Sequence, residues 1–187
     1  MFKKSLEKVT NTYSTFLAGG AGLSMFAVFL IIFINSTRRY AFDKSFEWGE
    51  QLPVFLAIYG VMFGVAWAYM NDQHVKFTIL VDFISKAWMK RLNIFVDFIM
   101  IITGFVLMYS GYVFAAKRGK IQASGLINGA KDLRDFFGID NLIILGKMYP
   151  YQFSIAFGGL LLALAALIRL LNRLYEADSD KVVEAGL

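Results

Sequence analysis

Long apolar runs alternate with polar links along this chain. The first run has no charged residue from Val9 to Thr37, and three comparable runs follow it. A helix needs roughly 20 apolar residues to cross the hydrocarbon core of a bilayer, whereas barrel strands are shorter and alternate strictly. We therefore predict an all-α integral membrane protein that forms a single membrane domain over 1–187. Its four transmembrane helices are expected at residues 14–36, 51–71, 92–116 and 150–170.

The N-terminal residues Lys3, Lys4 and Lys8 precede the first run in the manner of a signal peptide. The apolar run is longer than the h-region of such a peptide, and no clear small-residue cleavage site follows it. We expect this run to be retained as a membrane anchor.

Two links between the runs combine apolar residues with charges. His74–Leu92 is amphipathic and contains Trp88, so it is expected to lie along the membrane surface. The link Lys117–Lys147 is longer and is interrupted by glycines. Within it, Leu126–Gly138 is expected to form a short amphipathic helix outside the bilayer.

Composition supports a membrane protein and excludes several kinds of chemistry. Hydrophobic residues make up 58% of the chain, against about 45–50% in soluble domains. The net charge of +5 comes with basic residues that flank apolar runs, as membrane topology signals do, so no nucleic-acid partner is expected. The chain has no Cys and one His, which excludes disulfides, thiol nucleophiles, bis-histidine haem and multi-histidine metal sites. We expect no enzyme activity, no cofactor and no metal.

The basic residues leave the orientation of the chain open. Four spans place both termini on one side of the membrane, with ten Lys and Arg residues there and nine on the other side. The positive-inside rule does not decide between these numbers. The third link is long enough to dilute its charges, which slightly favours cytoplasmic termini.

Small residues form stripes of the kind that lets membrane helices approach closely. The stripe on the second run falls within an arc of roughly 80° at about 100° per residue, with Glu50 at its edge and Glu47 beyond. The stripe on the third run begins with a carboxylate. The second-run stripe is Ala57, Gly60, Gly64 and Ala68; the third-run stripe is Asp97, Gly104, Gly111 and Ala115; the fourth-run stripe is Ala156, Gly159, Ala163 and Ala166. These stripes either hold the four helices together or face another protein.

Charge is concentrated in the link between the first two runs. Arg38 and Arg39 close the first helix, and Glu47 and Glu50 open the second. Cations suit a helix C-terminus and anions an N-terminus, so one interpretation is a charge-capped hairpin with aromatic anchors. The other is that Glu50 and one arginine pair with a partner protein or with each other.

Asp97 lies about one and a half turns inside the third span, by the usual helical pitch. A carboxylate at this depth is costly and usually faces protein or water. Lys90, Arg91 or Asn93 could satisfy it, and a proton-relay role is an alternative. His74, which follows the second span, is more often a surface or hydrogen-bonding residue than a ligand.

Several short motifs follow one another in an informative order. An uncharged span is followed by Arg-Tyr, by Trp-x-Glu, by a second span with Gly-x-x-x-Gly, and by His-Val. The residues concerned are Arg39, Tyr40, Trp48, Glu50, Leu52, Gly60, Gly64, Ala66, His74 and Val75. This order resembles the small membrane subunit of the tripartite ATP-independent periplasmic (TRAP) transporters, the DctQ-like family. The chain departs from that family at Gln51, where an acidic residue is common, and has no basic residue shortly before His74.

The resemblance implies four helices with cytoplasmic termini in the bacterial inner membrane. It implies a part in sodium-coupled import of an organic anion, such as a C4-dicarboxylate or sialic acid. In such transporters a large polytopic membrane subunit carries the substrate and sodium sites, and a periplasmic binding protein delivers the substrate. The small subunit would be a fixed scaffold that contacts membrane lipids and the large subunit and helps to dock the binding protein.

Two sets of residues are candidates for these contacts. The first is expected at the interface with the large subunit, and the second at the docking surface for the binding protein. The interface candidates are Arg38, Arg39, Glu47, Glu50, Ala57, Gly60, Gly64, Ala68, His74, Asp97, Gly104 and Gly111. The docking candidates are Lys131 and Arg134.

Three alternatives stay open. A small transporter that acts alone as a homo-oligomer would need a carboxylate near mid-span, and Asp97 lies closer to the edge. A membrane enzyme or redox subunit would need a clustered catalytic set or two haem histidines. A structural subunit of another membrane complex would show the same packing faces and differ only in its partner.

Overall fold

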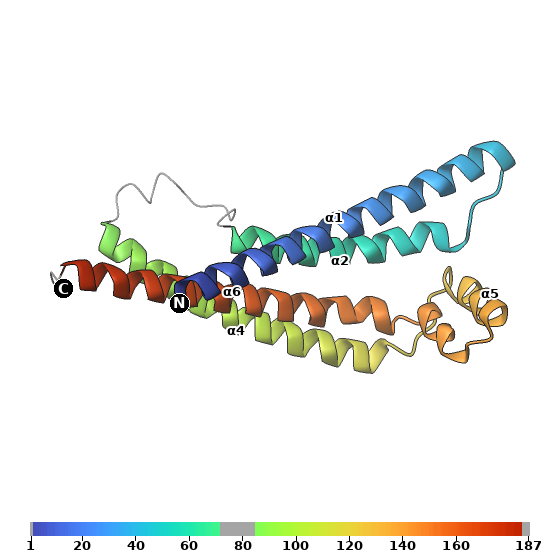
Figure 1. The fold of residues 1–187 in the computed structure, drawn as a ribbon. Coiled ribbons are helices and arrows are strands. Elements are labelled where there is room, and N and C mark those ends of the chain that lie inside the picture. The colour runs from blue at the N-terminus through green and yellow to red at the C-terminus, as the bar shows by residue number, and fades with distance from the viewer. Residues whose placement is uncertain (1, 72–84, 185–187) are drawn as a thin grey trace.

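The computed structural model describes residues 2–71 and 85–184 (Figure 1). Over these residues it is built from helices. They are α1 (Phe2–Phe42), α2 (Trp48–Met70), α4 (Lys86–Arg118), α5 (Ile127–Phe137), the 3-10 helix η1 (Asp140–Gly146) and α6 (Tyr149–Glu184). Within the described part of the chain, α1, α2, α4 and α6 are long and apolar enough to cross a membrane. The predicted fold class, an all-α membrane protein with four spans, is confirmed.

The helices continue beyond the apolar runs that predicted them. The residues from Lys86 to Leu92, expected in the interfacial segment, form the first turns of α4. The earlier part of that segment, including His74, lies outside the described residues. Helix α2 begins at Trp48, before the predicted start of the span at residue 51, so Pro53 lies in its second turn. Hydrophobicity marks the stretch of a helix that meets lipid or protein, whereas the backbone hydrogen bonds continue through polar residues.

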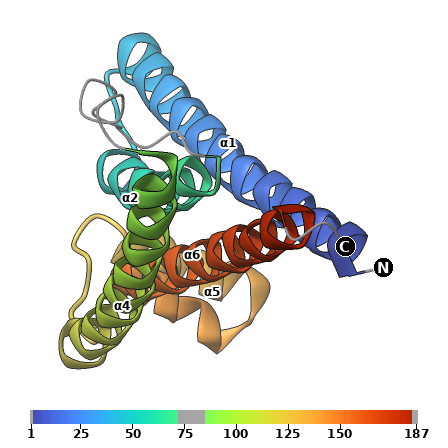
Figure 2. The ribbon, with the colours of Figure 1, turned by 90° about the vertical axis from the view of Figure 1, so that its left-hand side faces the viewer.

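The four long helices pack in the order α1, α2, α6, α4. Helix α6 contacts α4 most extensively, α2 lies between α1 and α6, and α1 touches α6 only slightly. Helices α1 and α4 are therefore the two edges of the arrangement (Figure 2). In the most apolar stretch of each helix, half of the α6 residues are buried, against 6% in α1 and 11% in α4. Helix α6 is the centre of the fold, and the edge helices turn most of their surface outward.

Glycines on α4 allow the close approach of α4 and α6. A Cβ atom at Gly104 would lie 2.7 Å from the backbone nitrogen of Ala163 and 2.8 Å from its Cβ. A Cβ atom at Gly111 would lie 2.8 Å from the Cα of Ala156. The small-residue stripes of the third and fourth spans thus pack against each other within this chain, as small residues do in membrane helix pairs.

A small unit made of α5 and η1 lies beyond the ends of α4 and α6 (Figure 1). Backbone hydrogen bonds join the segment that leads into this unit to the segment that leads out of it. Ala123 N donates to Gly146 O at 2.9 Å, and Met148 N donates to Ile121 O at 2.9 Å. Helix α5 confirms the amphipathic helix expected within Leu126–Gly138. Because its entry and exit are paired, the unit is held close to the ends of the spans.

Candidate functional site

The charged link between the first two spans folds into a tight hairpin. Asn35 Oδ1 accepts a hydrogen bond from Phe46 N at 2.8 Å, and the Asn35 amide also occupies the space where a Cβ of Gly49 would lie. Asp43 has a left-handed backbone (φ 54°), and its N–H donates to Arg39 O at 3.0 Å. A side-chain amide, a glycine and a left-handed residue therefore define the turn.

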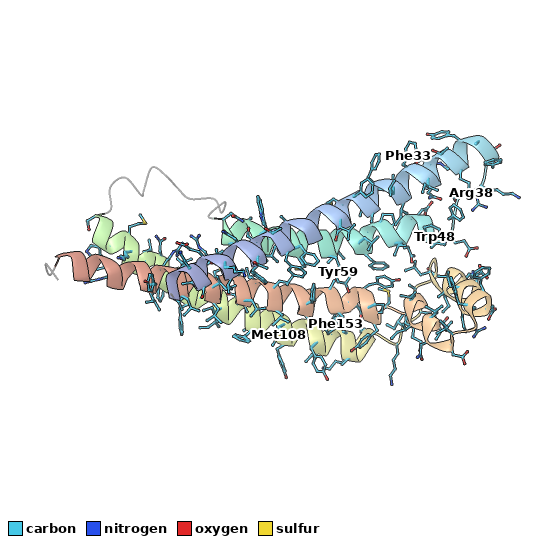
Figure 3. All side chains as sticks on the ribbon, in the orientation of Figure 1. Phe33, Arg38, Trp48, Tyr59, Met108 and Phe153 are labelled. Carbon is cyan, nitrogen blue, oxygen red and sulfur yellow. The ribbon has the colours of Figure 1, made fainter. Side chains whose placement is uncertain are left out.

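Arg38 is used within this hairpin. Its guanidinium carbon lies 3.8 Å from the centre of the Phe46 ring, a distance typical of a cation–π interaction. Phe46 stacks on Trp48, with ring centroids 4.9 Å apart. Figure 3 shows Arg38 and Trp48 close together at this end of α1 and α2. The Arg38 side chain thus contributes to the hairpin itself.

Glu47 and Gln51 connect the hairpin to the third link. Glu47 Oε2 accepts a hydrogen bond from Asn128 Nδ2 at 2.7 Å. Gln51 Nε2 donates to Ser124 Oγ, and Gln51 Oε1 accepts from Gly125 N, each at 3.3 Å. The amide of Gln51 donates and accepts at once, which an ionised carboxylate at this position could not do.

Arg39 and Glu50 face a shared cleft between the end of α1 and the start of α2. The cleft has a volume of about 300 Å³, and both side chains are exposed. Its other lining residues are Ile32, Asn35, Ser36, Gly49, Pro53 and Val54. A cleft that combines two opposite charges with both polar and apolar lining residues can accept a polar group from another molecule.

The predicted stripe on α2 divides between two environments. A Cβ atom at Gly60 would lie 2.6 Å from Met25 Cε, so Gly60 packs against α1, whereas a Cβ atom at Gly64 would meet nothing within 4 Å. Ala57 and Ala68 are half-buried. The outward face beside Gly64 carries small or β-branched residues. They are Val54, Val61 and Val65, which are exposed.

The outward faces of the edge helices are much bulkier. Exposed residues of α4 include Phe95, Phe98, Phe105, Tyr109, Tyr112 and Phe114, and those of α1 include Phe16, Phe26, Phe29 and Phe33. Figure 3 shows Phe33 pointing away from α2. Smooth faces favour contact between membrane helices, so α2 offers the better surface for another helix.

Asp97 is at the centre of a buried polar cluster. It is completely buried, and its Oδ2 lies 2.9 Å from Arg173 Nη1 in an ion pair. Tyr69 donates its hydroxyl hydrogen to Asp97 Oδ1, and Arg173 also donates to the carbonyl oxygen of Asn93 at 2.9 Å. Arg169, one turn earlier on α6, donates to the carbonyl oxygen of Met70 at 3.0 Å. The cluster joins α2, α4 and α6 near the ends where the chain termini lie.

Sequence reasoning did not find the partners of Asp97. Of the three expected ones, Asn93 takes part only through its carbonyl oxygen, which accepts from Arg173 rather than contacting Asp97. The alternation of spans could have indicated Arg173 as a partner. Because α4 and α6 run antiparallel, an early residue of the third span lies level with a late residue of the fourth. Arg173 is that late basic residue, whereas Tyr69 gave no comparable signal.

The remaining candidates lie in different places. Gly104 and Gly111 are buried against α6, as described above, so their small faces are used within the chain. Lys131 is exposed on α5. Arg134 pairs with Asp135 at 2.7 Å, and 38% of its side-chain surface is exposed. Among the residues that the structure describes, no group of three or more His, Cys, Asp or Glu could hold a metal ion.

Comparison with known proteins adds two findings. The family described as "Tripartite ATP-independent periplasmic transporters, DctQ component" matches residues 28–176, which is most of the chain. A Haemophilus influenzae protein provisionally named as a TRAP transporter small permease protein is 24% identical over 84 residues. That match covers 45% of this chain and 52% of the relative, so the chain spans about half of the relative's length.

Proposed function

The chain belongs to the DctQ component family of tripartite ATP-independent periplasmic transporters, and we propose that it acts as the fixed scaffold subunit of such a transporter. In this proposal it lies in the bacterial inner membrane with both termini in the cytoplasm. A large polytopic membrane subunit binds the substrate and sodium ions, and a periplasmic binding protein delivers the substrate. The substrate class is an organic anion of the C4-dicarboxylate or sialic acid type, as the family resemblance implies.

One observation carries the scaffold role. The buried carboxylate of Asp97 is paired with Arg173 inside the chain. An ion carrier needs a site that can release its ion, whereas a carboxylate already held by a guanidinium and a tyrosine hydroxyl is a structural link. The four spans also pack in a row, in the order α1, α2, α6, α4, which suits a part that lies against something larger. Both features favour a scaffold over a small transporter that works alone.

We place the large subunit against the outward face of α2. This face combines the open Gly64 with exposed valines, and it ends at Arg39 and Glu50. A partner helix could approach the backbone at Gly64, while its polar end reaches the charged cleft at the membrane boundary. Asp97, Gly104 and Gly111 are left out of this proposed interface, because they pack within the chain.

Replacing Gly64 by Leu should release the large subunit. The new side chain would fill the smooth face, and overpacking of about 1–3 kcal/mol corresponds to a roughly 5- to 150-fold weaker complex. The measurement is the amount of large subunit that co-purifies with the tagged chain in mild detergent. Ser110→Leu is a matched control, because it adds the same side chain on the exposed side of α4. Retained co-purification of Gly64→Leu at the level of the control would refute this interface.

Reversing two charges on α5 should weaken docking of the binding protein. Lys131→Glu with Arg134→Glu changes charges at the end of the molecule where the hairpin and α5 lie, and charges at the rim of an interface mainly set the association rate. We expect a severalfold lower uptake when the binding protein is limiting, with the membrane complex intact. Lys120→Glu, exposed on the third link but outside α5, is the control. Normal uptake by the double variant would count against docking at this surface.

A further inference from the structure

The unit of α5 and η1 has an apolar edge that its own fold does not cover. We call this set the outer apolar edge: Leu133, Phe136, Phe137, Ile139 and Ile144. All five side chains are exposed, and Phe136 reaches 82%. The inner side of the unit, by contrast, is well packed, since a Cβ atom at Gly146 would lie 2.7 Å from Ile127 Cδ1 and 3.0 Å from Ala130 Cβ. The exposed apolar groups are therefore on a unit whose other side is packed.

Two of the four charges of α5 lie on a different side of the helix from Leu133, whereas Asp132 lies only about 40° from Phe136. At about 100° per residue, Lys131 and Asp135 lie roughly opposite Leu133. The charges also cancel, because Lys131 and Arg134 are matched by Asp132 and Asp135. An amphipathic helix without net charge binds a surface through its apolar face, rather than through attraction to anionic groups.

The position of α5 places this edge at the boundary of the bilayer. Gly129 lies beside Trp48, and a Cβ atom there would be 3.1 Å from Trp48 Cδ1. Trp48 starts α2 and Tyr151 lies in the first turn of α6, and such aromatic residues favour the membrane–water interface. A cleft of about 420 Å³ separates α5 from the start of α2. It is lined by Trp48, Leu52, Leu126, Gly129, Ala130, Asp132, Leu133, Leu145 and Tyr151.

The outer apolar edge also continues into the outward surface of a span. Ile144 and the neighbouring Leu145 are exposed on η1, and Tyr149 and Phe153 are exposed on α6 directly after it. Tyr149 and Phe153 stack with their ring centroids 6.2 Å apart, and Figure 3 shows Phe153 near this end of α6. Apolar surface therefore extends along the chain from η1 to a helix that crosses the membrane.

From this geometry we propose that the outer apolar edge inserts into the bilayer leaflet at the α5 end of the molecule. Its partner is the acyl-chain region of phospholipids, which also fills the cleft beside Trp48. The paired entry and exit of the unit hold α5 at a fixed height, so its apolar edge meets lipid while Lys131 and Asp135 point to water. Insertion follows from the exposed apolar area and the absence of net charge, and it does not rest on the proposed transport function.

The absence of cysteine in the chain makes a direct test simple. A spin label is attached to the introduced cysteine of Phe136→Cys or of Ile144→Cys in the full chain. The labelled chain, together with any subunits that co-purify with it, is placed in nanodiscs of zwitterionic phospholipid. Collision with oxygen, which concentrates in lipid, is compared with collision with a water-soluble nickel chelate. Lys131→Cys is the aqueous reference and Phe105→Cys, on the outward side of α4, is the lipid reference. Two labelled positions on the edge keep the test valid if one variant does not fold.

We expect the labels at 136 and 144 to favour oxygen, as the lipid reference does, and the label at 131 to favour the chelate. Adding anionic phospholipid should leave these values unchanged. Preferential collision with the chelate at both edge positions would overturn the proposal, since the edge would then face water. Protection from both reagents would also overturn it, because the edge would then be covered by protein.

Discussion

Replacing Arg173 by Met should destabilise the folded chain by about 3–5 kcal/mol, the usual cost of removing one partner from a buried ion pair. The Asp97 carboxylate is fully buried, and the Arg173 side chain is only 17% exposed. Without the guanidinium, the carboxylate keeps the Tyr69 hydroxyl but loses its counter-ion. It cannot recover the lost interaction from water at this depth.

Thermal unfolding of the purified chain in detergent measures this effect, as a lower midpoint for Arg173→Met. Arg91→Met is the control, because Arg91 is exposed and its guanidinium carbon lies 5.7 Å from the centre of the Trp88 ring, a contact worth about 0.5–1 kcal/mol. Combining Arg173→Met with Asp97→Asn removes both charges and should recover much of the loss. An Arg173→Met midpoint equal to that of the control would show that the ion pair contributes little.

Replacing Gly111 by Ala should separate α4 from α6 and cost about 1–3 kcal/mol or more through overpacking. The added methyl group would lie 2.8 Å from the Cα of Ala156 and the same distance from the carbonyl carbon of Ile155. Both contacts are with backbone atoms, which no change of rotamer can move. Helix α6 must therefore shift as a whole.

Gly22→Ala is the matched control for this substitution. Gly22 lies on α1 with nothing within 4 Å of its Cβ position, and replacing glycine by alanine in a helix is otherwise favourable by about 1 kcal/mol. The two variants should thus change the unfolding midpoint in opposite directions. Equal midpoints would mean that the approach of α4 to α6 is looser than these distances indicate.

The hydrophobic pattern predicted the four spans and the short helix α5, because burial in lipid and an amphipathic period leave a direct trace in the sequence. Helix ends were predicted less well. Lys86 begins α4 even though it is charged, since a helix continues past the membrane wherever its backbone bonds can form. The Gly104 and Gly111 stripe was recognised, but its partner could not be assigned until α6 was seen to pack on it.

The pairing of side chains from different helices could not be predicted from the sequence. Asp97 and Arg173 are 76 residues apart, and only the antiparallel packing of α4 and α6 brings them together. Asn128 and Glu47 meet because the third link folds back over the first hairpin. Such contacts depend on the relative positions of helices, which neither periodicity nor composition specifies.

The scaffold role is tested most directly by purifying the tagged wild-type chain from its native membranes in mild detergent and identifying the co-purifying proteins by mass spectrometry. We expect one large polytopic membrane protein in an amount equal to this chain. Recovery of the chain alone, as a defined oligomer that transports a substrate after reconstitution into liposomes, would contradict the scaffold role.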